Sequence, residues 1–235
     1  MKIIEFSSKG SRKENQDFIA YRLMGDEAGI FVVADGMGGY ANGAEAAQVC
    51  AEAIVEYIEG HWYDNIDDDE KLRQSFIYAN ESLSFKRFAL GVKTMGCCLV
   101  ASLIKDGAVR FLWLGDTRGY LFRNGEEIYR TQDHSIVNEL AKIKTLRAED
   151  IEKYSNVVTR SMMGDDNLGP LEIEKQKYLP GDIVFLCSDG LHKEVEPERV
   201  IGSDSQMKTM IAEVSSRFDD NLTYLEIQNT SIANA

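Results

Sequence analysis

Val32-Val33-Ala34-Asp35-Gly36-Met37-Gly38-Gly39 is the stretch that decides the fold of this 235-residue sequence. An apolar run leads directly into an aspartate, and three glycines follow within four positions. A carboxylate at the end of a buried strand is costly unless a positive group meets it. Glycines at this density are expected where the backbone passes close to another group, and they let a main-chain carbonyl face a metal. The stretch therefore predicts a buried strand that ends at a cation site.

Four other segments combine an apolar strand with an aspartate beside a glycine or a polar residue. They are Asn15-Gln16-Asp17, Leu112-Trp113-Leu114-Gly115-Asp116, Phe185-Leu186-Cys187-Ser188-Asp189-Gly190 and Asp219-Asp220-Asn221-Leu222-Thr223. Taken singly, Asp-Gly after a strand is more often a turn than a ligand. Residues 35–39 could also cradle a phosphate, although they fit neither common phosphate-loop pattern. Converging strand ends would form a nearly all-oxygen cluster that suits Mg²⁺ or Mn²⁺, so we interpret the segments as one divalent-metal site.

The spacing of apolar residues predicts many short strands. Strands are expected over 2–6, 17–23, 29–34, 96–104, 108–114, 119–123, 126–129, 171–178, 182–187 and 222–228. Asp106-Gly107 and Asn124-Gly125 lie between apolar runs, and these dipeptides favour tight turns in which both residues have positive φ. The strands on either side of each turn are therefore expected to be antiparallel neighbours.

Helical periodicity is confined to a few blocks. It predicts helices over 42–59, over 70–88 and near 206–217, and helical or irregular structure over 135–153. Asn42 and Glu45 are spaced as a capping box at the start of the first helix. Runs of strands with helices in consecutive pairs favour an α+β fold over a parallel βαβ sheet. Because no linker, repeat or long low-complexity tract divides the chain, residues 1–235 are interpreted as one domain.

Composition excludes several classes of function. A net charge of −13 and a pI near 4.7 argue against a nucleic-acid partner. No apolar run is long enough to cross a bilayer, and the first residues lack the apolar core of a signal peptide. We expect a cytoplasmic monomer without membrane association. Its four cysteines are expected to be buried and reduced; they are Cys50, Cys97, Cys98 and Cys187.

In order and over nearly the whole chain, the sequence resembles the PP2C-like (PPM) protein phosphatases in their compact bacterial form. The most specific match is the block 33–39. The other matches are 11–17 with R-x-x-N-x-D, 115–120 with G-D-S-R, 131–135 with T-x-D-H-S, 158–164 with T-R-A-L-G, and 187–191 and 220–223 with the closing metal motifs. Residues 135–156 match weakly, and the mobile flap of the family lies there.

The resemblance implies a four-layer α-β-β-α sandwich, in which two antiparallel sheets are flanked by helix pairs. It also implies two Mn²⁺ or Mg²⁺ ions at one end of the sandwich. By resemblance, Asp35 bridges the two ions and the Gly36 carbonyl binds the second ion. Asp189 and Asp220 hold the first ion.

Three further residues take their roles from the same resemblance. Asp17 supports the cluster directly or through water. Asp116 takes part in a weaker third metal site. Arg12 grips the substrate phosphate, since its planar fork suits two phosphate oxygens.

The implied activity is hydrolysis of phosphoserine and phosphothreonine in proteins by a hydroxide activated at the binuclear centre. Phosphorylated proteins and a cognate Ser/Thr kinase are the expected partners. A non-catalytic phosphoprotein-binding pseudophosphatase and a small-molecule phosphomonoesterase are the alternatives. A structural Ca²⁺ module is disfavoured because the ligands are dispersed. A cysteine phosphatase is excluded because Cys187 has Lys193, not arginine, six residues later.

Overall fold

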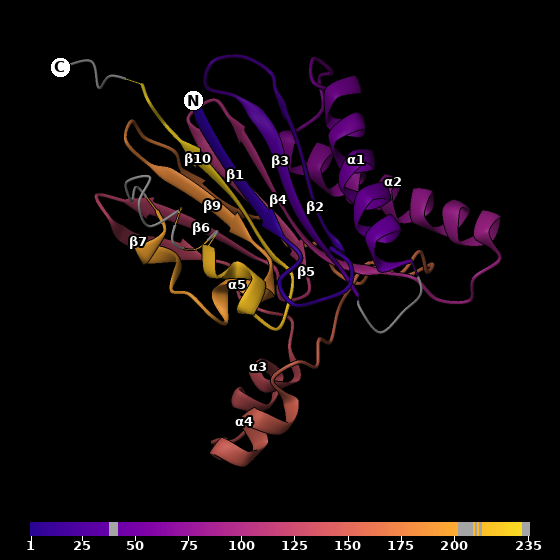
Figure 1. Ribbon diagram of the computed structural model, residues 1–235. Coiled ribbons are helices and arrows are strands. Elements are labelled where there is room, and N and C mark those ends of the chain that lie inside the picture. Colours follow the sequence, from indigo (N-terminus) through magenta and orange to yellow (C-terminus); the bar gives the residue numbers. More distant parts are fainter. Residues whose placement is uncertain (38–41, 202–208, 210, 212, 232–235) are drawn as a thin grey trace.

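The computed structural model describes residues 1–37, 42–201, 209, 211 and 213–231, and the statements below concern these residues. Two five-stranded sheets pack face to face, and two long helices cover the outer face of one of them (Figure 1). One sheet has the strand order β1-β10-β9-β6-β7 and the other has the order β2-β3-β4-β5-β8. Every pair of adjacent strands is antiparallel, as predicted.

The strands follow the predicted blocks closely. Their bounds are β1 (Lys2–Ser8), β2 (Asp17–Leu23), β3 (Gly29–Gly36), β4 (Cys97–Lys105), β5 (Ala108–Leu114), β6 (Arg118–Arg123), β7 (Glu126–Arg130), β8 (Glu174–Lys177), β9 (Ile183–Cys187) and β10 (Leu222–Gln228). The two predicted turns are confirmed, because Asp106, Gly107, Asn124 and Gly125 all have positive φ. The strand predicted over 171–178 is shorter than expected, since only its second half pairs with β5.

The helices are α1 (Gly43–Gly60), α2 (Asp68–Leu90), α3 (Ile136–Ala141), α4 (Ala148–Tyr154) and α5 (Asp189–His192), with 3-10 turns at Pro197–Arg199 and Ser215–Arg217. The predicted capping box at Asn42 is wrong. Asn42 has a left-handed φ of 69°, and its side chain makes no cap bond; it donates to the Glu45 carboxylate instead (3.1 Å). Of the helix predicted near 206–217, residues 206–208, 210 and 212 lie outside the described residues, whereas the described residues 209, 211, 213 and 214 are helical and lead into the 3-10 turn at Ser215–Arg217. No helix among the described residues is both long and apolar enough to cross a membrane.

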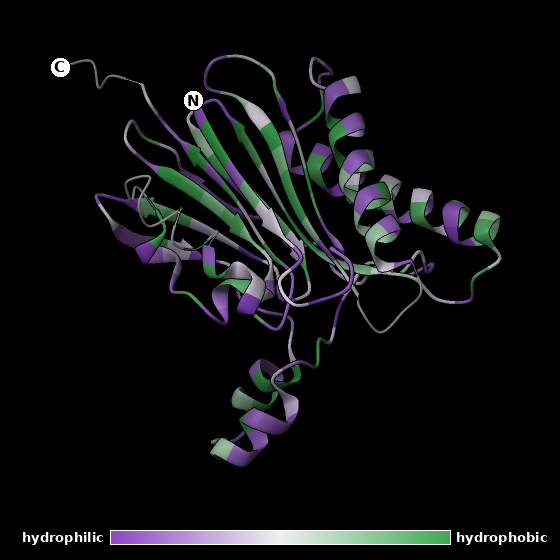
Figure 2. Cartoon of the chain, in the orientation of Figure 1, coloured by the Kyte–Doolittle hydropathy of each residue, from purple (hydrophilic) through white to green (hydrophobic). Residues whose placement is uncertain are grey.

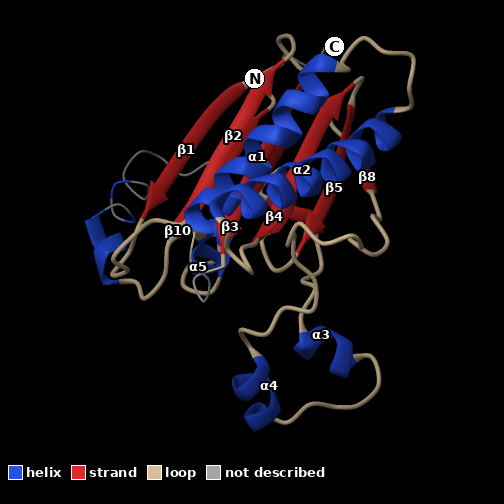
Figure 3. Ribbon diagram, turned by 90° about the vertical axis from the view of Figure 1, so that its right-hand side faces the viewer, coloured by secondary structure: helices blue, strands red, loops and turns tan. Residues whose placement is uncertain are grey.

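Burial on both faces of β3 explains the apolar run that precedes Asp35. Ile30, Val32 and Ala34 face α1 and α2, whereas Phe31 and Val33 face the second sheet. A strand between a helix layer and another sheet has no polar face, so it reads as a continuous apolar run. Figure 2 shows the same green core between the layers, and Figure 3 shows α1 and α2 lying across the strands of their sheet.

The outer face of the second sheet is covered by shorter elements. Leu191 of α5 packs there with Val200, Ile201 and Ile211, against a layer that includes Phe185. The described residues therefore bear out the α-β-β-α order of layers, with a full helix pair on one side.

The four cysteines are free and buried, as predicted.

Two helices, α3 and α4, lie apart from the core. Residues 136–157, which we call the flap, carry α3 and α4 and project away from the sandwich (Figure 1). Neither flap helix has a buried residue, so the flap contributes little to the core.

Antiparallel pairing places an aspartate from each sheet at the same end of the sandwich. In one sheet Asp17 begins β2 directly opposite Asp35, near the end of β3. In the other, Asp189 follows the end of β9 and Asp220 precedes the start of β10, which are paired neighbours. The open end of each hairpin-like pair therefore presents two carboxylates.

Gly190 tests how tightly these strand ends are packed. A Cβ at Gly190 would lie 2.0 Å from the Asn221 carbonyl oxygen and 3.0 Å from Asp220 Cβ. We expect Gly190→Ala to lower the free energy of unfolding by about 1–3 kcal/mol through overpacking, although alanine favours helices. The control is Gly60→Ala at the end of α1, where a Cβ meets nothing within 4 Å. Urea unfolding followed by circular dichroism measures both, and equal stability of the two variants would contradict the prediction.

Candidate metal centre

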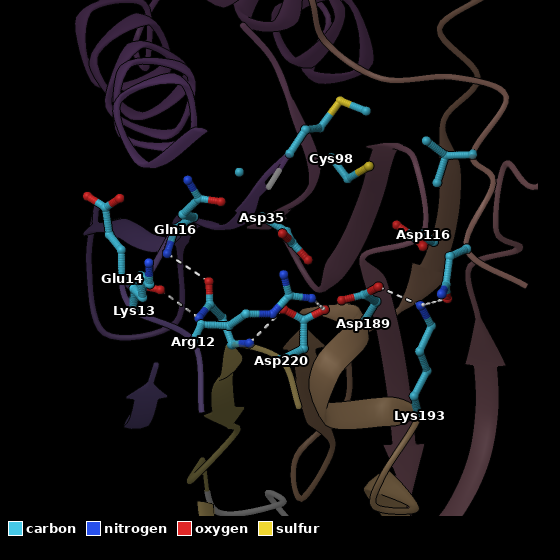
Figure 4. Close-up of a pocket in the computed structure, with 15 residues that line it drawn as sticks. Arg12, Lys13, Glu14, Gln16, Asp35, Cys98, Asp116, Asp189, Lys193 and Asp220 are labelled. Atoms are coloured by element: carbon cyan, nitrogen blue, oxygen red, sulfur yellow. Dashed lines mark hydrogen bonds and ion pairs between the residues drawn. The ribbon is translucent and has the colours of Figure 1, made fainter. Parts of the chain in front are cut away.

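A cavity of about 960 Å³ opens at the end of the sandwich where the aspartates meet. Six of the seven predicted site residues line it: Arg12, Asp35, Gly36, Asp116, Asp189 and Asp220 (Figure 4). The seventh, Asp17, is buried behind them. It is close enough for its charge to repel that of Asp35 and to be repelled by Asp189 and Asp220. The structure thus brings together the seven predicted site residues.

Local backbone geometry explains how the strands deliver these side chains. A Cβ at Gly36 would lie 2.3 Å from the Gly43 carbonyl oxygen, so only glycine lets β3 end beside the start of α1. Gly115 has a φ of 105°, which turns the chain between β5 and Asp116. Gly38 and Gly39, which were also singled out, lie outside the described residues.

Asn221 ties the loop that carries Arg12 to β10. Its Oδ1 accepts from the Gln16 amide (2.8 Å), and its Nδ2 donates to the carbonyls of Lys9 (2.9 Å) and Glu14 (3.0 Å). Sequence reasoning placed Asn221 in a motif but gave it no role. A buried amide next to a candidate ligand was the available signal, because such groups must find partners.

Burial and mutual repulsion raise the pKa values of several of these aspartates. The pKa of Asp17 is raised to about 7, mainly by burial and further by Asp189 and Asp220, although a hydrogen bond from Ser188 Oγ (2.7 Å) opposes the rise. The pKa of Asp35 is raised well above its ordinary value by burial and then by Asp17 and Asp189. The pKa of Asp116 is raised to about 6, again mainly by burial. The negative charge of such a cluster is poorly compensated by the protein alone.

The donor set fits a hard divalent cation. All the side-chain donors are carboxylate oxygens, which Mg²⁺ and Mn²⁺ prefer. Asp17 Oδ1 is buried and has no hydrogen-bond partner in the described structure. A cation would relieve both the unpaired oxygen and the repulsion among the carboxylates.

Two of the carboxylates are held by cationic side chains. Arg12 Nη2 lies 2.9 Å from Asp220 Oδ2, and Lys193 Nζ lies 2.6 Å from Asp189 Oδ2. No group of three or more His, Cys, Asp or Glu side chains in the described part of the chain is arranged so that it could hold a metal ion. The contacts of Arg12 and Lys193 occupy one oxygen each of Asp220 and Asp189.

Comparison with known proteins places the chain in a family. A family model described as protein phosphatase 2C matches residues 7–226. The chain belongs to the protein phosphatase 2C family. It is similar to protein phosphatase PhpP of Streptococcus pneumoniae, with 31% identity over 187 residues that cover 77% of this chain and 74% of PhpP.

Solved structures of protein phosphatase 2C relatives share the fold. One is the catalytic domain of the serine/threonine protein phosphatase PstP in complex with two manganese ions, which is 25% identical with a TM-score of 0.75 and 96% of each chain covered. Another is PppA, a regulatory component of T6SS in Pseudomonas aeruginosa, which is 30% identical with a TM-score of 0.72 and the same coverage. The predicted α+β sandwich and the predicted family are both confirmed.

The raised pKa of Asp17 predicts a pH-dependent effect of its removal in this protein phosphatase 2C relative. The folded state holds the Asp17 proton more tightly than the unfolded state, so this group's contribution to stability falls as pH rises from about 4 through 7. We expect Asp17→Asn to stabilise chelator-treated protein at pH 8 by on the order of 2 kcal/mol, since one pKa unit is worth about 1.4 kcal/mol and coupled carboxylates share the penalty.

Thermal and urea unfolding at pH 8 and pH 5 check this prediction. The gain should be smaller at pH 5, where folded Asp17 is protonated. Asp106→Asn, in the exposed turn between β4 and β5, is the matched control and should change stability little at either pH, because asparagine tolerates its positive φ. An Asp17→Asn protein that is no more stable than wild type at pH 8 would show that Asp17 is not under electrostatic strain.

Proposed function

We propose that this chain is a metal-dependent protein serine/threonine phosphatase that hydrolyses phosphoserine and phosphothreonine in proteins. The observation that carries the proposal is the convergence of Asp17, Asp35, Asp116, Asp189 and Asp220 from both sheets on one open cavity. Membership of the protein phosphatase 2C family and the serine/threonine phosphatase names of similar proteins support it.

We assign the cofactor as two Mn²⁺ or Mg²⁺ ions per chain. Asp35 is the proposed ligand of both ions, and the Gly36 carbonyl is a proposed ligand of the second ion. Asp189 and Asp220 are the proposed ligands of the first ion. Asp17 is proposed to support these ligands. When bound, the ions lower the pKa of water and withdraw charge from the phosphoryl oxygens. Ser188 holds Asp17 in place, since its Oγ donates to Asp17 Oδ2 and accepts from the Thr223 amide (3.0 Å).

Arg12 is the proposed phosphate-binding residue. Its guanidinium lies at the rim of the cavity with 51% of its side chain exposed, and among the described residues it donates hydrogen bonds to Asp220 and to the Asp219 carbonyl (Nε to O, 2.8 Å). A substrate phosphate offers the same guanidinium two oxygens in a matching plane. Transfer of Arg12 from Asp220 to the phosphate would free that carboxylate for a cation, so substrate and metal would not compete for it.

The leaving oxygen of the substrate is proposed to take its proton from solvent. The two histidines nearest the cavity are neutral at pH 7. Burial, followed by the positive charge of Arg118, lowers the pKa of His192 to about 4. Burial and then Arg160 lower the pKa of His134 to about 4 as well. Neither imidazole therefore holds a proton to donate near neutral pH.

Several wider properties belong to the same proposal. We infer that residues 1–235 form one domain and that the protein acts as a monomer on phosphorylated proteins, opposing a cognate Ser/Thr kinase. Four buried free thiols favour a reducing compartment, which supports a cytoplasmic location.

Release of phosphate from a phosphothreonine peptide tests the proposed function. We expect turnover that depends on Mn²⁺ or Mg²⁺, is abolished by chelator, and falls at least about 10²–10³-fold in Asp35→Asn because a developing charge loses its stabilisation. Asp106→Asn is the control and should match wild type. Metal-loaded protein without turnover of any phosphopeptide would contradict the proposal and favour a pseudophosphatase. Turnover of small phosphomonoesters alone would favour a small-molecule phosphomonoesterase.

Arg12 predicts a separate kinetic signature. We expect Arg12→Ala to raise KM for the phosphopeptide about 10–100-fold at saturating Mn²⁺, since a hydrogen bond to a charged group is worth about 1.5–3 kcal/mol. The control is Arg22→Ala, because Arg22 is exposed on β2 and pairs with Glu59 on α1. An unchanged KM in Arg12→Ala would remove Arg12 from phosphate binding.

A further inference from the structure

Lys193 is a cation inside the carboxylate cluster. It follows α5, and its Nζ donates to Asp189 Oδ2 (2.6 Å) and to Asn156 Oδ1 (3.0 Å). Figure 4 shows the side chain rising from the helix toward Asp189, on the side of the cavity where Asp116 lies. The ammonium therefore reaches the metal-ligand candidates and the end of the flap at once.

Asp116 faces the same ammonium. Asp116 and Asp189 repel each other, and the positive charge of Lys193 acts against that repulsion at both residues. The Lys193 ammonium contacts Asp189, and Asp116 and Asp35 line the same cavity. A single point charge with three donors is thus shared among several acidic side chains.

An ordinary surface ion pair does not describe this contact. Pairs four residues apart on an exposed helix contribute little to stability, because solvent screens both charges. Here the Asp189 side chain is 16% exposed and lies near the carboxylates of Asp17, Asp35 and Asp116, whereas Lys193 is 36% exposed. A charge in such surroundings is screened less and acts on the whole cluster.

We propose that Lys193 is a built-in cation of this site. Its ammonium takes the position between Asp116 and Asp189 that a third divalent ion would otherwise occupy, and it fastens the flap through Asn156. The inference rests on the proposed function, and it revises the expectation that Asp116 serves a third metal ion in this chain. A divalent ion beside a fixed ammonium would be repelled, which limits the site to two ions.

The flap contact extends the same role. Asn156 lies just beyond α4, and backbone hydrogen bonds hold the two chain segments at the base of the flap to each other, from Ile136 N to Val157 O (2.9 Å) and from Thr159 N to His134 O (2.8 Å). Lys193 adds a side-chain link from the flap to a metal-ligand candidate. Displacement of the ammonium would therefore loosen the flap and open the third position together.

Equilibrium dialysis with metal analysis tests whether Lys193 takes the place of a third ion. It measures the number of Mn²⁺ ions bound at millimolar Mn²⁺. We expect two ions for wild type and for Lys193→Arg, which keeps the charge. Lys193→Met should bind three, and Lys193→Met combined with Asp116→Asn should return to two. Circular dichroism and thermal unfolding verify that each variant is folded.

Failure of this inference and failure of the proposed function give different results. If wild type and Lys193→Met bind the same non-zero number of ions, or wild type binds three, the Lys193 inference is overturned and the phosphatase proposal stands. If none of the proteins binds Mn²⁺, both are overturned.

Trypsin cleavage tests whether Lys193 holds the flap through Asn156. The sites are Lys142 and Lys144, the exposed lysines between α3 and α4. Asn156→Ala removes the flap contact and leaves the ammonium beside Asp189. We expect both Asn156→Ala and Lys193→Met to be cut several-fold faster than wild type, with the ion count raised only in Lys193→Met. Cleavage rates equal to wild type, or an extra bound ion in Asn156→Ala, would contradict the proposal that Lys193 both excludes the third ion and holds the flap.

Discussion

Repulsion among carboxylates that the fold forces together is the constraint on which the rest of this structure depends. Asp17 and Asp35 face each other across β2 and β3, and Asp189 and Asp220 meet them from the other sheet. Burial and repulsion raise the pKa values of Asp17 and Asp35, so these two side chains would be easier to bury as neutral groups. The molecule keeps them at a cost to its own stability, which is typical of sites built for a ligand.

The architecture around the cluster is arranged to deliver that charge. Antiparallel pairing makes the end of one strand coincide with the start of the next, so two short hairpin-like pairs present four acidic positions at one edge. Gly36 and Gly190 allow the backbone to pass where any Cβ would collide, and Asn221 fastens the loop of Arg12 to the same edge. Asp17 and Asp35 thus lie on strands and Asp189 and Asp220 directly beside strand ends, whereas Arg12 lies in a loop and Lys193 follows the short helix α5.

Local sequence patterns predicted most of the strands and the candidate site. The features that they did not predict depend on contacts between residues far apart in the chain. Alternation and Asp-Gly turns placed β2, β3, β5 and β10 to within about two residues, because each depends on neighbours in the chain. The capping box at Asn42 failed because the turn into α1 adopts a left-handed conformation. The role of Lys193 was missed because its partner Asn156 lies far away in sequence, although its position four residues after Asp189 was a usable signal.

A net charge of −13 is unfavourable for a protein whose proposed substrate is anionic, and local cations resolve this conflict. Thermal unfolding at pH 7.5 with and without Mn²⁺ tests this central claim most directly. Mn²⁺ at about 100 times its dissociation constant should stabilise wild type by about 2.7 kcal/mol for each site filled, and Asp35→Asn much less. An unfolding temperature of wild type that does not respond to Mn²⁺ would contradict the claim that these carboxylates form a metal centre.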